Sequence, residues 1–197
     1  MARRRTETMG PRDAMTASAV ALIRERGVAA TSFADVLANS GAPRGSIYHH
    51  FPGGKSQLIE EATRSAADQL TAGVERILAS GDTVTAVRSL VDLWRQGLED
   101  TGYVAGCPIV AAALGTESVA RGIAGESFAR WGELIGARLA LDGIDPVRAE
   151  TLATMFVSAL EGGLILAQAQ RSAAPLDAVV GELELLCRAA EAVTPRG

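Results

Sequence analysis

Side chains that donate hydrogen bonds are concentrated in one short segment around residue 46 of this chain. A helix over that segment would hold four of them on its outer face: Arg44, Ser46, Tyr48 and His49. Ile47 and Phe51, four residues apart, would form its buried face. Side chains of these outer types donate to phosphate oxygens and to the edges of bases. The segment therefore favours recognition of nucleic acid.

A catalytic function is not expected. Gly125-Glu126-Ser127-Phe128-Ala129 loosely resembles the turn that carries a nucleophilic serine, but it lies inside a helical pattern with no strand before it. A triad also needs a histidine, and both histidines, His49 and His50, lie in the segment described above. No phosphate-binding loop, zinc spacing or pair of carboxylates is present. We expect no enzyme, no metal site and no cofactor.

The surrounding pattern predicts a helix-turn-helix, whose second helix enters the DNA major groove. Phe33, Val36 and Leu37 give the first helix an apolar stripe, with Ser32 as its N-cap and Gly41 as its stop. The second helix is expected to span about eight residues, because Pro43 suits a first helical turn. An ordinary helical hairpin in a bundle has the same period, and the exposed donors favour DNA over that alternative.

The predicted DNA-binding residues belong to both helices and to the start of the next one. They are Thr31, Ser32, Pro43, Arg44, Gly45, Ser46, Tyr48, His49 and Lys55. Arg44 and His49 are expected at base edges, and Ser46 and Tyr48 at phosphates. The alternative for Tyr48 is packing against the helix before the motif. Arg3, Arg4 and Arg5 either enter the neighbouring minor groove or form a solubilising tail.

Residues 44–52, Arg-Gly-Ser-Ile-Tyr-His-His-Phe-Pro, followed by Lys55 and Leu58, resemble the signature of the TetR family of bacterial transcriptional repressors. The similarity covers roughly residues 11–62. Gly53-Gly54 is one residue longer than the spacing in most members. This glycine and Gly106-Cys107-Pro108-Ile109 resemble the lincomycin-resistance-repressor (LmrA/YxaF-like) subgroup. The resemblance implies a dimer, a ligand cavity between helices, and a drug-export gene as the target.

Lys55 is the only lysine among nineteen basic residues, and it stands at the start of a long predicted helix. The helix dipole disfavours a cation at that end, so stability does not explain the choice of residue. We expect a phosphate contact, which agrees with the role that the family resemblance gives this lysine. The alternative is a solvated surface lysine.

Charge is distributed unevenly along the chain. Residues 1–55 hold eight basic and four acidic side chains, a net charge of +4, whereas the remainder holds eleven basic and nineteen acidic ones, a net charge of −8. A basic N-terminal part on an acidic body is typical of a DNA-binding protein. Cys107 and Cys187 lack neighbouring metal ligands, and reduced buried thiols are favoured over a redox switch.

The expected fold is all-α, with about nine helices. Residues 1–56 are expected to form a three-helix DNA-binding domain, and residues 57–197 a helical domain for effector binding and dimerisation. Outside the motif, the helices are expected at about Pro11–Arg26, Gly54–Ser80, Thr83–Leu98, within Gly102–Leu114, Glu117–Ala140, Pro146–Arg171 and from Ala174 on. A break at Gly122 or Gly125 is an alternative for the range Glu117–Ala140.

The segment between Glu150 and Arg171 contains a single charge, Glu161. A helix that is apolar nearly all round must be covered on more than one side, and a second subunit would supply the extra cover. Complete burial in the monomer is the alternative. The predicted dimer residues are Ala159, Glu161, Gly162, Gly163 and Leu183. Glu161 is equally compatible with a place in the effector pocket.

The predicted effector pocket collects the aromatic side chains of the second domain and their neighbours. They are Trp94, Tyr103, Cys107, Phe128, Trp131, Phe156 and Leu160. Core packing is the alternative for any single ring. Few charges reach this region, so a mostly apolar, uncharged or weakly polar aromatic effector is expected. Its binding would spread the DNA-binding domains and release the operator.

The sequence also bears on where the protein acts. Thr-Glu-Thr, not an apolar run, follows the N-terminal arginines, so no signal peptide is expected. The longest uncharged apolar stretch, Tyr103 to Gly115, is too short to span a bilayer. We expect a cytoplasmic protein without a membrane partner. Besides a ligand-responsive repressor of a double-stranded DNA operator, an architectural DNA-binding protein and a helical adaptor fit the pattern.

Overall fold

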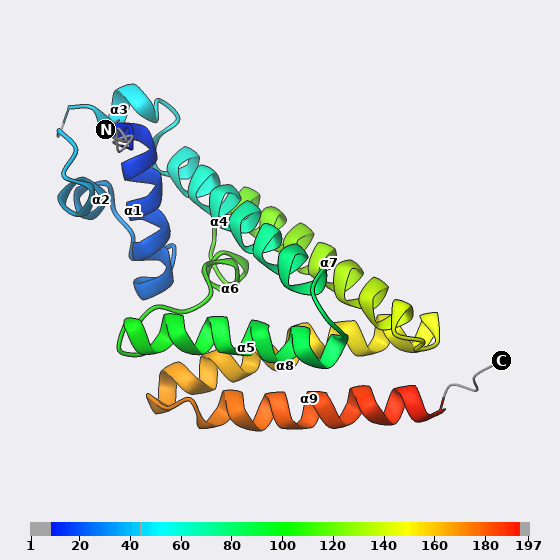
Figure 1. Cartoon of the computed structure of the whole chain (residues 1–197). Helices are drawn as coiled ribbons and strands as arrows, with labels where there is room; N and C mark the ends of the chain where they lie inside the picture. Colours follow the sequence, from blue (N-terminus) through cyan, green and yellow to red (C-terminus); the bar gives the residue numbers. More distant parts are fainter. Residues whose placement is uncertain (1–8, 44, 194–197) are drawn as a thin grey trace, which may run out of the picture.

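The computed structural model describes residues 9–43 and 45–193, and over these ranges it contains nine helices and no strand (Figure 1). The N-terminal domain holds α1 (Pro11–Arg26), α2 (Phe33–Ser40) and α3 (Ile47–His50). The body holds α4 (Gly54–Leu78), α5 (Thr83–Asp100), α6 (Pro108–Ala113), α7 (Ser118–Leu141), α8 (Pro146–Gln170) and α9 (Ala174–Val193). The all-α prediction is confirmed. The predictions for Arg3, Arg4, Arg5 and Arg44 lie outside the described residues.

Local capping signals set the predicted helix ends. The Ser32 hydroxyl accepts a hydrogen bond from the Asp35 backbone N–H at 3.2 Å, and Gly41 ends α2 in the left-handed region at φ 68°. Asp145 accepts from the Arg148 backbone N–H at 3.0 Å and so begins α8 ahead of Pro146. The expected ends of these helices are confirmed.

The second helix of the motif is shorter than expected. It begins at Ile47, not at Pro43, because the preceding residues form a turn in which the Ser46 N–H donates to the Pro43 carbonyl at 2.9 Å. Pro43 therefore precedes α3, and the prediction that it lies in the first helical turn is wrong.

Helix α7 is continuous, so the alternative of a break at Gly122 or Gly125 is wrong. Each interior glycine costs roughly 1 kcal/mol of helix stability, but packing of α7 along α4 and α8 outweighs that cost. Ser127 is buried inside this helix, and its hydroxyl donates to the Ile123 carbonyl at 2.7 Å. It does not stand on a nucleophile turn.

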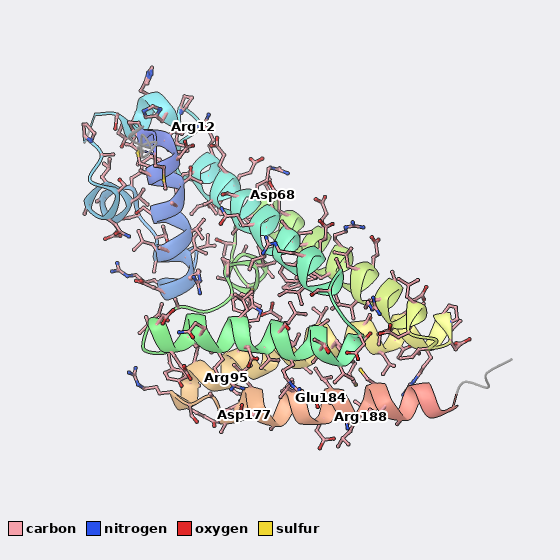
Figure 2. The ribbon with its side chains drawn as sticks, in the orientation of Figure 1. Arg12, Asp68, Arg95, Asp177, Glu184 and Arg188 are labelled. Atoms are coloured by element: carbon pink, nitrogen blue, oxygen red, sulfur yellow. The ribbon has the colours of Figure 1, made fainter. Side chains whose placement is uncertain are left out.

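The body has two groups of helices that close around α6 (Figure 1). Helix α4 leaves the N-terminal domain and runs beside α7, while α5 and α9 pack together next to α8. Arg95 of α5 contacts Asp177 of α9 (Figure 2). The Arg88 guanidinium of α5 also lies 2.6 Å from Glu184 of α9. The expected domain division at residues 56/57 falls within the first turn of α4, a helix that packs against both α1 and α7.

The loop before α6 joins the end of α1 to the end of α8. The Gly106 N–H donates to the Arg24 carbonyl at 2.9 Å, and Arg24 Nε donates back to the Gly106 carbonyl at 3.0 Å. On the other side, Gln168 Nε2 donates to the Val104 carbonyl at 2.9 Å. We call these four residues, Arg24, Val104, Gly106 and Gln168, the joint.

Glycine in the joint leaves room for the Gln168 amide, because a Cβ on Gly106 would lie 2.3 Å from Gln168 Oε1 at the end of that side chain. The Gly106→Ala variant should displace the Gln168 amide and lose its hydrogen bond to Val104, lowering the free energy of unfolding by about 0.5–1.5 kcal/mol. Urea denaturation measures this. Gln168→Ala removes the same bond, so the double variant should lose little more than either single one. Fully additive losses would contradict the assignment.

Candidate DNA-binding surface and effector cavities

Helix α3 is anchored by its inner side chains and leaves its outer ones exposed. Ile47 and Phe51 are 1% and 0% exposed, whereas Tyr48 is 69% exposed. The Tyr48 ring meets Phe33 edge-on, with ring centroids 5.6 Å apart. Tyr48 thus contacts the start of α2, not α1 as the alternative had it, and its hydroxyl end stays available for an acceptor such as a phosphate.

Most other predicted DNA-binding residues lie at the surface of the motif. Pro43, Gly45 and His49 are exposed, and the Ser46 hydroxyl is half-buried and donates to the Pro43 carbonyl at 2.7 Å. Thr31 differs, because it is 1% exposed and its hydroxyl donates to the Gly27 carbonyl at 2.9 Å. Its side chain stabilises the turn after α1 and does not face outward.

Lys55 extends from the first turn of α4 to the linker between α1 and α2. Its Nζ donates to the Ala29 carbonyl at 3.1 Å. An ammonium has three N–H donors, so this bond leaves two for another acceptor. The ammonium is therefore held at the linker, three residues before Ser32, the N-cap of α2.

The extra glycine allows the chain to turn from α3 into α4. Gly54 has φ 76°, a conformation that side chains with a Cβ rarely adopt. Next to it, Gln57 Oε1 accepts from the Gly53 N–H at 2.7 Å and Gln57 Nε2 donates to Glu61 at 2.9 Å. Glu61 in turn lies 2.7 Å from Arg12 of α1, which is labelled in Figure 2. These bonds fix the exit of α3 against α1.

The predicted effector residues do not line one pocket. Phe128 lines a cavity of about 980 Å³ between α6, α7 and α8. Trp94, Trp131 and Leu160 border a space of about 40 Å³ between α4, α5, α7 and α8, and Cys107 borders one of about 120 Å³ beside the joint. Tyr103 and Phe156 border none of these three. The prediction of a single pocket formed by these residues is wrong.

The aromatic rings fill the body more than they surround a ligand. Phe156 is 1% exposed and belongs to the core. Trp131 is 6% exposed, and its indole N–H donates to the Thr71 hydroxyl of α4 at 2.9 Å. The large cavity instead exists because α7 presents small residues to it, namely Ala129, Gly132, Gly136, Ala137 and Ala140.

Glu161 borders all three cavities. Its Oε2 atom is buried and has no hydrogen-bond partner among the described residues. Burial raises the pKa of Glu161 to about 7, although contact with the Cys107 side chain lowers it in part. Burial likewise raises the pKa of the Cys107 thiol well above its usual value. The sequence singled out Glu161 without deciding its place, and the structure puts it at the cavities.

Two of the predicted dimer residues pack within one chain. Leu183 is 2% exposed, and a Cβ on Gly163 would lie 3.2 Å from Val179 and 3.3 Å from Leu176. Gly163 therefore allows close approach of α9 of the same chain, and its prediction as an interface residue is wrong, as is that of Leu183. Ala159 is half-buried, and a Cβ on Gly162 would meet open space.

An uncharged face nevertheless remains on the last two helices. We call it the α8/α9 face, and it consists of Val147, Thr151, Thr154, Ser158, Gly162, Ile165 and Ala169 on α8 with Ala174, Ala178, Gly181, Leu185 and Ala189 on α9. Ile165 is 49% and Leu185 60% exposed. Helix α8 is long and apolar enough to cross a membrane, and 39% of its most apolar window is buried. Core helices of soluble proteins share this composition.

Comparison with known proteins matches residues 16–62 to bacterial regulatory proteins of the tetR family, and residues 83–182 to the C-terminal domain of LmrA/YxaF-like transcriptional regulators. An HTH-type transcriptional regulator of Mycobacterium tuberculosis is 43% identical over 187 residues, which cover 90% of this chain and 94% of that protein. YxaF of Bacillus subtilis is 26% identical over 181 residues, 90% of this chain and 95% of that protein.

Solved structures agree with these matches. A TetR transcriptional regulator from Legionella pneumophila has the same fold, with a TM-score of 0.82 and 22% identity over 92% of this chain and 99% of that one. A second from Chloroflexus aurantiacus has a TM-score of 0.78 and 29% identity over 90% of this chain and 94% of that one. The matched families and relatives are transcriptional regulators, not enzymes.

The raised pKa of Glu161 gives a prediction about pH. The folded chain holds this proton more tightly than the unfolded chain, so the stabilisation is complete below the pKa of a free glutamate and is lost as pH rises to about 7. Glu161→Gln removes that loss. The free energy of unfolding of the variant, relative to that of the wild type, should therefore increase by roughly 1–3 kcal/mol as the pH rises from about 5 to 8.

Urea denaturation at equal protein concentration measures this difference. Glu133→Gln is the matched control, because the Glu133 side chain borders the same cavity but is 69% exposed. Equal pH dependence in the wild type and in Glu161→Gln would show that Glu161 is not buried as described.

Proposed function

Because this chain belongs to the TetR family of bacterial regulatory proteins, we propose that it is a ligand-responsive transcriptional repressor. It binds an inverted-repeat operator as a homodimer, and a small, mostly apolar effector releases it. The main support for the proposal is a connection between the cavity and the DNA-binding domain. Helix α6 lines the cavity of about 980 Å³, and the loop before α6 is hydrogen-bonded to α1.

Contacts to DNA follow from the exposed side of the motif. Tyr48 and Lys55 contact phosphates, and His49 meets base edges. The hydroxyls of Ser46 and Ser32 join them only by giving up their bonds to the Pro43 carbonyl and to the Asp35 carboxylate. Arg44, which lies outside the described residues, joins His49 in the proposal on sequence grounds alone. Pro43 and Gly45 let the backbone approach the DNA. Thr31 is left out of these contacts, since its side chain is buried and its N–H donates to the Val28 carbonyl at 3.3 Å.

The dimer uses the α8/α9 face. An uncharged exposed face of this length on two neighbouring helices needs cover, and a second copy supplies the same face in return. The two α3 helices would then lie about 34–36 Å apart and bind half-sites one DNA turn apart. A second subunit, not a bilayer, covers α8, which fits a regulator that works on DNA in the cytoplasm.

Release depends on a coupling between the cavity and the DNA-binding domain. An effector between α6, α7 and α8 favours one arrangement of these helices over another. Movement of α6 reaches Gly106 and Arg24 directly, because the loop before α6 is bonded to the end of α1. The effector thus binds best to a state in which the two DNA-binding domains no longer match the half-site spacing.

Lys55→Ala tests the phosphate contact on an operator selected from random DNA. Loss of one phosphate contact should weaken binding to all sequences alike and reduce the slope of log K against log salt by about one unit. Fluorescence anisotropy over a range of salt concentrations measures it. Arg88→Ala, which removes a cation paired with Glu184 in the body, should leave the slope unchanged. A slope unaffected by Lys55→Ala would refute the contact.

Leu185→Glu tests the dimer. Two carboxylates placed on a desolvated two-fold face repel each other, so the variant should sediment as a folded monomer at micromolar concentration and lose cooperative operator binding. Leu141→Glu is the control, since Leu141 is 79% exposed at the end of α7 and lies off the α8/α9 face. A dimer that survives Leu185→Glu, or a wild type that sediments as a monomer, would contradict the proposed interface.

A further inference from the structure

We propose that the effector is a lipophilic amine, whose protonated nitrogen binds Glu161 inside the cavity between α6, α7 and α8. This inference rests on the proposed function, because it names the chemical class of the ligand that the repressor responds to. It also revises the expectation of an uncharged effector, which the sequence suggested because few charges reach the region.

The cavity lining combines an apolar wall with charge of one sign. Val110, Leu114, Phe128, Val157 and Ile165 give it apolar surface, and the small residues of α7 give it room. Among the described residues that line it, the charged ones are Glu133, Glu150 and Glu161, and none is an arginine, lysine or histidine. At about 980 Å³ the cavity accommodates a drug-sized molecule. Such a lining attracts an apolar cation and repels an anion.

Glu161 differs from the other two carboxylates in its surroundings. Glu133 is 69% exposed and lies 3.5 Å from Arg130, and Glu150 is exposed on the first turns of α8. Glu161 Oε2 is buried and lacks a hydrogen-bond partner among the described residues. A buried carboxylate oxygen without a partner costs free energy that a donor from the ligand recovers.

An ammonium suits this oxygen better than a neutral donor. A charge-assisted hydrogen bond is stronger than a neutral one, and the low dielectric around the buried Glu161 Oε2 increases the attraction between the charges. The α8/α9 face beside the cavity mouth includes Thr154, Ser158 and Ile165 and carries no charge. A second subunit that packs on that face closes the cavity. The residues that it contributes are those of the same uncharged face, so they add no positive charge to the cavity.

The test uses three amines, each with the alcohol of the same shape: 4-phenylbenzylamine, 2-naphthylmethylamine and dodecylamine. Binding to the full-length dimer is measured by isothermal titration calorimetry at about pH 8. At least one amine should bind about ten-fold more tightly than its alcohol. Glu161→Gln should reduce that preference to about two-fold or less, whereas Glu133→Gln, a carboxylate at the rim, should keep it.

Three results would overturn the inference: no saturable binding by any amine, alcohols that bind as tightly as their amines, or a preference that persists in Glu161→Gln. Circular dichroism and sedimentation of Glu161→Gln establish that it remains a folded dimer. Operator binding is followed separately by anisotropy. An amine that binds through Glu161 without weakening operator binding would uphold this inference and contradict the ligand response in the proposed function.

Discussion

Helix α8 has one ionisable side chain, Glu161, among the twenty residues between Glu150 and Arg171, so nearly its whole surface must be kept from water. Helices α7 and α9 cover two of its sides, and α5 touches a third. Ile165 and Leu166 remain about half exposed, at 49% and 51%. The dimer face, the large cavity and the buried carboxylate all follow from how this one helix is covered.

The same helix connects the cavity to the DNA-binding domain. Its Gln168 holds the loop before α6, whose Gly106 is paired with Arg24 at the end of α1. Cys107, the next residue, faces Glu161 on α8 and leads directly into α6. A ligand that changes the surroundings of Glu161 therefore acts on the segment that holds α1. The subgroup motif around Gly106 is explained by this joint more directly than by ligand contact.

Local signals in the sequence predicted the helices well, since caps such as Ser32, Gly41 and Asp145 act on their own neighbours. It was harder to predict what each side of a helix packs against. The helical spacing that suggested Gly163 and Leu183 as interface residues is equally suited to packing of α9 on α8 within one chain, and that is where both residues lie. The rings of Trp131 and Phe156 gave no indication of whether they fill space or border it. Glu161 stood out as a lone charge, yet only three-dimensional packing places it at the cavities.

The central claim is that cavity occupancy changes the separation of the two DNA-binding domains. A spin label is attached to a cysteine introduced at the exposed Ala38 of α2 in each subunit. Pulsed electron–electron double resonance then measures the distance between the two labels. Operator DNA should narrow the distances to one population, because half-sites one turn apart fix the two domains at about 34–36 Å between recognition helices. A compound that stabilises the protein against heat should shift that population and release the DNA. An unchanged distance distribution with the compound bound would contradict the account.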